Sequence, residues 1–317
     1  MAANDNTVPV YLITGFLDSG KTNFLKFTMQ EDYFNDGSRT LLILCEEGEE
    51  DYPVKVLRKT HTDMEIIDEE SDLTAEKLEE LNKKYHPERV LIEFNGMWSV
   101  PNFLKIPLPD KWLLYQIITV LDGENFGLYL NNIKNTSMEL LTNTDMVIFN
   151  RCTEDTDLVL YQRTTRSVNS RCDIIFEDKD GGELECPEPD LPYSLEDDPL
   201  KITDENYGTF YIDINEHPER YEGKQIEILV QIMQNKSFPK NIFIGGRRAM
   251  TCCVEDIRFL PWIFIYDKAK SLPAKDYANI TSTFRWEFNE GYQGEGPVFH
   301  VNDVKLATKP AEELITF

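Results

Sequence analysis

A short stretch near the N-terminus, GFLDSGKT, runs from Gly15 to Thr22 and has residue types that could do chemistry. Its glycines and its Lys-Thr pair stand at the spacing of a phosphate-binding loop. In such a loop backbone N–H groups surround the phosphates, Lys21 reaches the terminal phosphates, and the Thr22 hydroxyl is offered to Mg²⁺. An apolar strand-like run precedes the loop and a helical pattern follows it, so a chance glycine turn is the weaker interpretation. The stretch predicts binding of a nucleoside triphosphate with Mg²⁺.

The elements that must position this loop are predicted within residues 8–175, where short apolar runs alternate with helical patterns. Helices are expected over residues 19–31 and 74–85, the second with acids early and lysines late, as the helix dipole favours. Continuous apolar strands separated by helices are typical of a parallel sheet covered on both faces, and therefore of an α/β fold. The predicted strands are residues 8–14, 39–47, 89–94, 116–122, 145–150 and 172–178.

The pattern changes after residue 177. Residues 178–206 are acidic and rich in Pro and Gly, which indicates a linker between a domain of residues 1–177 and a second of residues 207–317. In the second domain KQIEILVQIMQ alternates with period two, so its isoleucines and Val230 point to one face. Further strand-like segments follow, punctuated by Gly and Pro, and predict a small all-β domain, most economically a five-stranded barrel.

The composition of the whole chain limits its partners. It carries 32 Lys and Arg against 57 Asp and Glu, a formal net charge of −25. We expect no nucleic-acid binding, because a phosphate backbone requires a basic surface. The sequence contains no apolar run long enough to predict a membrane span, and its start does not resemble a secretory signal. Six irregularly spaced cysteines do not form a disulfide framework, so we expect a reducing, cytoplasmic location.

The phosphate loop and four further stretches resemble the CobW-like metallochaperone GTPases, whose relatives include the maturation GTPases of nickel enzymes. The stretch LLILCEEGEED supplies Glu46, RVLIEFNGMWSVP supplies Glu93 and Gly96, IITVLDGENF follows, and TDMVIFNRCTE stands at the base-recognition strand. The resemblance covers residues 8–175. It implies slow hydrolysis of the β–γ bond of GTP with Mg²⁺, with Lys21, Glu46 and Glu93 as catalytic residues and Thr22, Glu46 and Glu93 around the metal.

The two glutamates also make physical sense at these positions. Each follows an apolar strand, and ligands of an open α/β sheet sit at the carboxyl ends of the strands. One carboxylate would hold Mg²⁺ through water while the other orients the attacking water. The alternative for either residue is a solvated loop acid. Gly96 would let the backbone approach the terminal phosphate.

The sequence departs from the family at the base-recognition motif. The family pattern is Asn-Lys-x-Asp, in which the Asp accepts two donors from the guanine edge, whereas this chain has Asn150, Arg151, Cys152 and Thr153. A threonine cannot replace that bidentate acceptor. Asn150 and Arg151 can still contact or stack on a base. Preference for GTP over ATP is therefore implied by the resemblance, and ATP stays open.

A second departure concerns transition metals. The family's Gly-Cys-x-Cys-Cys cluster is missing from this sequence. The cysteine nearest to its expected position is Cys45, which is followed by several carboxylates. Cys45 could bind Zn²⁺ weakly, or it is a buried residue at a strand end. Cys252 and Cys253 are a second candidate pair, although neighbouring residues of a strand point to opposite faces, so core cysteines are the alternative.

Residues 207–317 resemble the soluble C-terminal domain of an uncharacterised bacterial membrane-protein family found beside permeases. The matching pieces are YEGKQIEILVQI, RRAMTCCVEDI, GPVFHVNDVKLATKP and the closing ITF. The resemblance implies a fold and little chemistry.

Together these patterns predict an Mg²⁺-dependent nucleoside triphosphatase that acts as a nucleotide-driven switch, with a client metalloprotein or another protein as partner. The alternative from another class is a non-catalytic nucleotide-sensing adaptor whose β domain binds a protein. A kinase would need an arginine-rich lid, which the first half of the chain does not show. The residues expected to contact nucleotide are Gly15, Phe16, Leu17, Asp18, Ser19, Gly20, Lys21, Thr22, Asn23, Gly96, Asn150 and Arg151.

Overall fold

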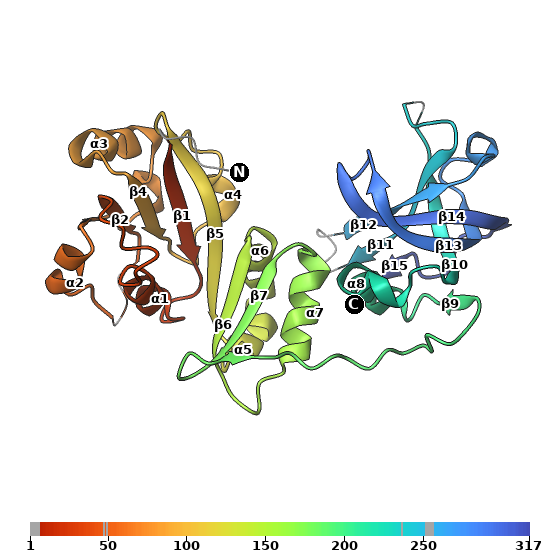
Figure 1. The fold of residues 1–317 in the computed structure, drawn as a ribbon, viewed down its shortest axis with the longest axis horizontal. Coiled ribbons are helices and arrows are strands. Elements are labelled where there is room, and N and C mark those ends of the chain that lie inside the picture. The colour runs from red at the N-terminus through yellow and green to blue at the C-terminus, as the bar shows by residue number, and fades with distance from the viewer. Residues whose placement is uncertain (1–6, 47, 49, 236, 251–256) are drawn as a thin grey trace. The chain divides into compact units, whose positions relative to one another are not determined.

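The computed structural model describes residues 7–46, 48, 50–235, 237–250 and 257–317. The chain divides into two compact units (Figure 1). Unit 1 contains residues 1–165 and 171–187, and unit 2 contains residues 166–170 and 188–317. No helix within the described ranges is long and apolar enough to cross a membrane.

Unit 1 is built on a sheet of eight strands in the order β3-β2-β4-β1-β5-β6-β7-β8. All neighbouring pairs are parallel except β7 with β8. The predicted mostly parallel α/β fold is confirmed, and β3 and β8 are additions that the sequence patterns did not indicate. The strands are β1 (Val8–Thr14), β2 (Thr40–Leu44), β3 (Thr62–Ile66), β4 (Arg89–Glu93), β5 (Trp112–Asp122), β6 (Met146–Cys152), β7 (Asp173–Asp178) and β8 (Glu183–Leu184).

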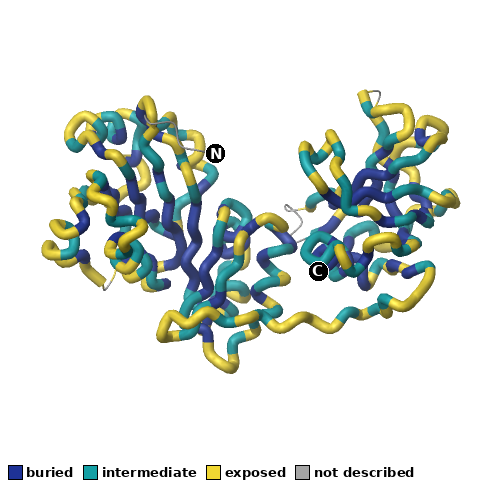
Figure 2. The backbone as a smooth tube through the Cα atoms, viewed as in Figure 1, coloured by how far each residue is buried: buried dark blue, intermediate teal, exposed yellow. Residues whose placement is uncertain are grey.

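Helices lie on both faces of this sheet. On one face Leu25 of α1 and Leu57 of α2 pack into the cluster that holds Ile13 of β1. On the other face Leu78 and Leu81 of α3 pack against alternate residues of the same strands, so the central strands are buried on both sides (Figure 2). The helices of this unit are α1 (Lys21–Thr28), α2 (Val54–Lys59), α3 (Ala75–Tyr85), α4 (Val100–Phe103), α5 (Phe126–Asn132), α6 (Lys134–Thr142) and α7 (Leu158–Val168), the last three residues of which are assigned to unit 2.

The two helices predicted from sequence are both present. Helix α3 begins after Thr74, whose side chain accepts a hydrogen bond from the N–H of Lys77, as an N-cap does. It ends at His86, which adopts a left-handed conformation before Pro87. Helix α1 begins directly after the glycine turn that leaves β1, so the phosphate-binding loop lies at the carboxyl edge of the sheet.

Unit 2 contains the predicted five-stranded barrel. Strands β10 to β14 pair in the order β10-β11-β12-β14-β13, and β13 returns to β10, which closes the ring. Among the five pairs of this ring only β12 with β14 is parallel, an arrangement similar to the OB-fold barrel. The strands are β10 (Gln225–Met233), β11 (Ile242–Met250), β12 (Ile257–Ile265), β13 (Tyr277–Asn289) and β14 (Gly294–Ala307), with short strands β9 (Leu200–Ile202) and β15 (Leu314–Ile315) at the edges.

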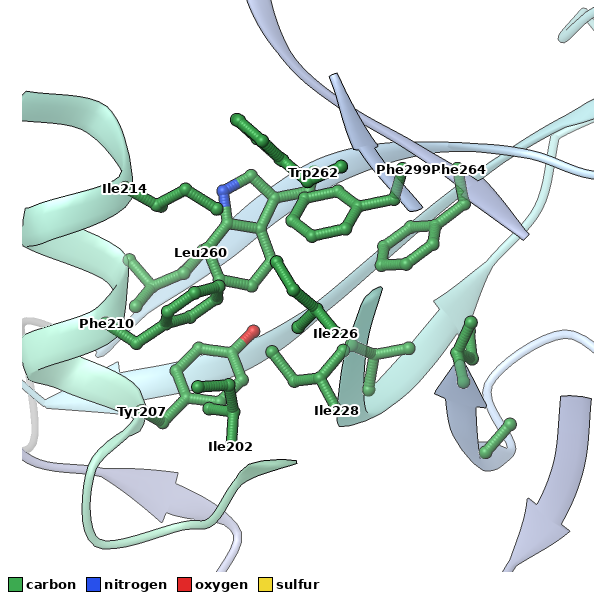
Figure 3. Packing of buried hydrophobic residues seen from close by; sticks show 14 of the residues in the cluster. Ile202, Tyr207, Phe210, Ile214, Ile226, Ile228, Leu260, Trp262, Phe264 and Phe299 are labelled. Carbon is green, nitrogen blue, oxygen red and sulfur yellow. The ribbon is translucent and has the colours of Figure 1, made fainter. Parts of the chain in front are cut away.

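The barrel core explains the period-two pattern. Ile226 and Ile228 of β10 point inward and pack with Trp262, Phe264 and Phe299 (Figure 3). Helix α8 (Tyr207–Glu216), which the sequence analysis had not separated from the β domain, contributes further aromatic and aliphatic side chains to the same core. Fully burying one such side chain stabilises the fold by about 2 kcal/mol. The shared core of α8 and the barrel strands therefore holds unit 2 together.

Candidate nucleotide-binding site

The loop between β1 and α1 has the backbone geometry that its glycines permit. Gly15 and Gly20 have φ of 139° and 99°, and Asp18 between them has φ of 56°. A Cβ on Gly15 would lie 2.0 Å from the carbonyl oxygen of Val120, and one on Gly20 would lie 2.5 Å from the side-chain nitrogen of Asn150. Side chains at both positions are therefore excluded by conformation and by space.

The ammonium group of Lys21 is the positive charge at the centre of the loop. It donates to the carbonyl oxygens of Gly15 (2.8 Å) and Phe16 (2.9 Å) and to the carboxylate of Glu46 (2.7 Å). These contacts use its three donors, and only 3% of the side chain is exposed, against 11% for Glu46. A phosphate group and the Glu46 carboxylate would compete for this one cation.

Glu93, at the carboxyl end of β4, is a buried carboxylate beside Thr22. The Thr22 hydroxyl donates to one Glu93 oxygen at 2.7 Å, and the hydroxyl of Tyr52 donates to the other. Burial raises the pKa of Glu93, and the hydrogen bonds from Tyr52 and Thr22 oppose the shift. Tyr52 was not singled out in the sequence, because it follows a run of acids and no motif marks it.

Gly96 brings the turn after β4 against the phosphate-binding loop. A Cβ at this position would lie 2.1 Å from the carbonyl oxygen of Gly15. The described backbone therefore requires a glycine here for contact with the loop, in addition to the approach to phosphate expected from sequence. The acidic segment between β2 and α2 closes another side, since Gly48 lies near Asp18 and the Glu50 carboxylate is 2.6 Å from the ammonium group of Lys26.

The end of β6 is tied to the loop by two side chains. Asn150 donates from its amide nitrogen to the carbonyl oxygen of Ser19 at 2.8 Å. Arg151 donates to the carbonyl oxygen of Asp18 at 2.9 Å and to the carboxylate of Asp122 at 3.0 Å. The structure thus brings the two expected base-contacting residues to the phosphate-binding loop.

Thr153 has a local role in the turn that follows β6. Its hydroxyl accepts from the N–H of Asp155 at 3.3 Å, and its own N–H donates to the hydroxyl of Thr156 at 2.9 Å. These bonds organise the turn before α7. They leave the position that carries the family's guanine acceptor with a single neutral hydroxyl.

The predicted residues and the acidic segment enclose a cavity of about 170 Å³. Oxygen-bearing side chains face the Lys21 ammonium and the Thr22 hydroxyl across it, which is the donor set that Mg²⁺ prefers. The residues that line it include Leu17, Asp18, Gly20, Lys21, Thr22, Asn23, Glu46, Gly48, Glu50, Glu93 and Arg151.

Cys45 is placed differently from the other predicted residues. It is 2% exposed at the end of β2, and burial raises the pKa of its thiol, as do the nearby charges of Glu93 and Glu46. Among the described residues no group of three or more His, Cys, Asp or Glu side chains could hold a metal ion. The other candidates, Cys252 and Cys253, lie outside the described residues.

We expect the buried thiols to resist alkylation. Burial raises the pKa of Cys152 to about 11, so at pH 8 about 0.1% of that thiol is ionised. In peptide mapping after iodoacetamide treatment, Cys45 and Cys152 should react at least about 10-fold more slowly than the half-buried Cys186. Denaturant should equalise the rates. Fast labelling of Cys45 in the folded chain would contradict the placement described here.

Solved structures that resemble this chain in fold include a GTPase and a hydrogenase maturation factor. The hydrogenase maturation factor HypB from Archaeoglobus fulgidus is 19% identical, and the alignment covers 56% of this chain and 84% of HypB with a TM-score of 0.43. The Zn(II)-bound YjiA GTPase from E. coli is 16% identical, with coverage of 76% and 86% and a TM-score of 0.43. A search of curated proteins found no match.

Two family models match the chain. The model of the DUF1980 C-terminal domain matches residues 188–315, which confirms the second resemblance. The model described as CobW/HypB/UreG, nucleotide-binding domain, matches residues 9–176, more than half of the chain. The matched range includes the phosphate-binding loop, Glu46, Glu93 and the Asn150-Arg151 pair. The chain belongs to the CobW/HypB/UreG family of nucleotide-binding domains.

Proposed function

We propose that this chain is an Mg²⁺-dependent nucleoside triphosphatase that acts as a nucleotide-driven switch. Family membership supports nucleotide binding. The observation that carries the proposal is the pairing at the loop, where Lys21 contacts Glu46 and Thr22 contacts Glu93. The cation expected to bind phosphate therefore has a carboxylate beside it, and the hydroxyl expected to bind magnesium has the buried carboxylate of Glu93 beside it. Residues of these types hold phosphate, magnesium and the attacking water in P-loop NTP hydrolases.

The residues at the loop fit a magnesium ion. Thr22 would supply its hydroxyl and Glu93 or Glu46 a carboxylate, and all three are hard oxygen ligands. A bound Mg²⁺ would neutralise negative charge on the phosphate oxygens. The remaining work belongs to the chain: Lys21 binds the terminal phosphates, the loop amides orient them, and the carboxylate not engaged with the metal orients the attacking water.

The acidic segment is the proposed switch. It leaves β2 at Glu46, held by Lys21 at 2.7 Å, and reaches Glu50, held by Lys26 at 2.6 Å. Both lysines belong to α1, the helix that starts at the phosphate-binding loop. A triphosphate that takes the Lys21 ammonium releases Glu46, so nucleotide binding and the position of this segment are coupled.

Neutralising Glu46 should strengthen nucleotide binding when magnesium is chelated. The Glu46→Gln variant removes the competing carboxylate, so in EDTA we expect the Kd for nucleotide to fall by about 10-fold. Glu76→Gln, in the first turn of α3, is the matched control and should leave the Kd unchanged. Chelation isolates competition for Lys21 from any part Glu46 has in holding magnesium. Unchanged or weaker binding by Glu46→Gln would contradict the switch.

Titration calorimetry with GTP and ATP tests the nucleotide itself. Family membership favours GTP, and Asn150 and Arg151 adjoin the phosphate-binding loop. Since Thr153 offers no carboxylate to the guanine edge, the proposed preference for GTP over ATP should be small, about 10-fold or less. Binding of neither nucleotide would refute the proposal.

A further inference from the structure

On one face of the sheet in unit 1, helices cover only one half of the width, and the strands of the other half carry no helix among the described residues. The apolar cluster on the side of α1 includes Ile118 of β5, Ile148 of β6 and Ile175 of β7, yet the helical side chains packed into it come from α1 and α2. Both of these short helices belong to the β1-β4-β2 half. A parallel sheet normally has helices over both faces along its whole width.

The remaining half forms an open trough of about 870 Å³. Its walls carry large side chains that are exposed to solvent, with Phe27 of α1 at 66%, Tyr33 at 76% and Tyr115 of β5 at 63%. The ring of Tyr115 contacts that of Tyr11 in a tilted arrangement, with 5.3 Å between the ring centroids, so the apolar surface is continuous with the sheet. Exposed apolar surface gathered in this way marks an interaction site more often than isolated exposed residues do.

Among the described residues of unit 1, none of the other helices covers this trough. Helices α5 and α7 contribute Phe126 and Tyr161, which pack on Phe149 of β6, the residue that follows Ile148 and therefore points to the opposite face. After β7 the chain turns at Gly181 into β8 instead of entering a helix. Residues 187–199 follow, with prolines that prevent a regular helix.

We propose that this trough, bounded by Phe27, Tyr33 and Tyr115 over strands β5 to β7, is the docking site for an amphipathic helix of a protein partner. Three neighbouring strands at about 4.8 Å spacing offer a width of about 10 Å, the diameter of one helix. A helix seated there would lie beside α1 and complete the layer that α1 begins.

Charge indicates the chemistry of that helix. The trough ends at the β7–β8 turn, where Glu177, Asp178 and Asp180 line it together with Lys179. Its two arginines, Arg89 and Arg151, are already paired with Asp36 and Asp122. The whole chain carries a net charge of −25, which disfavours a second copy as the occupant. The partner helix should therefore be apolar on one face and basic on the other.

A model peptide tests this site on the full chain. The probe is a fluorescent 18-residue peptide of Leu and Lys with leucines at helical spacing, and its control has the same composition in strict alternation, which does not form an amphipathic helix. We expect the helical peptide to bind at least about 10-fold more tightly than the control peptide by fluorescence anisotropy. Tyr115→Asp and Phe27→Asp should each weaken that binding at least about 10-fold.

The matched variant is Leu128→Asp, on α5 and 61% exposed, which adds the same charge and should leave binding unchanged. Equal binding of both peptides would show charge attraction alone, and equal loss in all three variants would show that the peptide does not bind specifically in the trough. Either result would overturn the proposal. Sedimentation of the wild type tests whether a second copy of this chain occupies the trough instead. A dimer that Tyr115→Asp dissociates would assign the trough to a second copy, which also overturns it. Failure here would leave nucleotide binding at Lys21 untouched.

Discussion

Replacing Lys21 by alanine is expected to weaken nucleotide binding by about 100-fold, which corresponds to about 3 kcal/mol. The variant removes the ammonium that the loop holds with Gly15, Phe16 and Glu46. It also leaves the Glu46 carboxylate beside the phosphates without its cation, which adds repulsion. Titration calorimetry with GTP and ATP in the presence of Mg²⁺ measures the change.

Lys77→Ala, on the distant helix α3, is the control for loss of one positive charge in an acidic protein. It should bind nucleotide as the wild type does. Circular dichroism must show that Lys21→Ala remains folded. If folded Lys21→Ala binds nucleotide with wild-type affinity, the loop does not bind the triphosphate and the proposed function fails.

Replacing Glu93 by glutamine should abolish most of the turnover while leaving binding intact. The amide oxygen can still accept from Thr22, and the Tyr52 hydroxyl can rotate to accept from the amide nitrogen, so the local structure is retained. What is lost is the buried negative charge that holds magnesium or orients water. We expect phosphate release to slow by about 100-fold or more.

The measurement pairs steady-state phosphate release with calorimetry in EDTA. Nucleotide affinity of Glu93→Gln without magnesium should not be weaker than that of the wild type, since a negative charge near the phosphates has been removed. Glu76→Gln again serves as the control for loss of one carboxylate. A variant that hydrolyses nucleotide within about threefold of the wild-type rate would remove Glu93 from the catalytic machinery.

Much of unit 1 could be predicted because its signals are local. The glycine-lysine-threonine spacing predicts the loop, and the apolar runs predict six of the strands in its sheet. In unit 2, period-two alternation predicts the barrel strands and the inward face of Ile226 and Ile228. Each of these features depends on residues that are close together in the sequence, so no knowledge of long-range contacts is needed.

The remaining features depend on contacts between distant residues. The Lys21–Glu46 pair joins positions 25 residues apart, and the Tyr52–Glu93 bond joins positions 41 residues apart. The trough over β5 to β7 exists because no helix among the described residues of unit 1 covers these strands on the side of α1. A local sequence pattern does not show which part of a sheet is left uncovered. Strand β3 has an intermediate and exposed burial pattern, typical of a sheet edge, and lacks the apolar run that marked the central strands.

The central claim is that the loop and its two carboxylates hydrolyse a nucleoside triphosphate with magnesium. Phosphate release from GTP and ATP, followed in single-turnover conditions with Mg²⁺ and with EDTA, tests it most directly. The account predicts release at least about 10-fold faster with Mg²⁺ than with EDTA. Tight nucleotide binding with release no faster in Mg²⁺ than in EDTA would contradict it, and is the behaviour of a non-catalytic nucleotide-sensing adaptor.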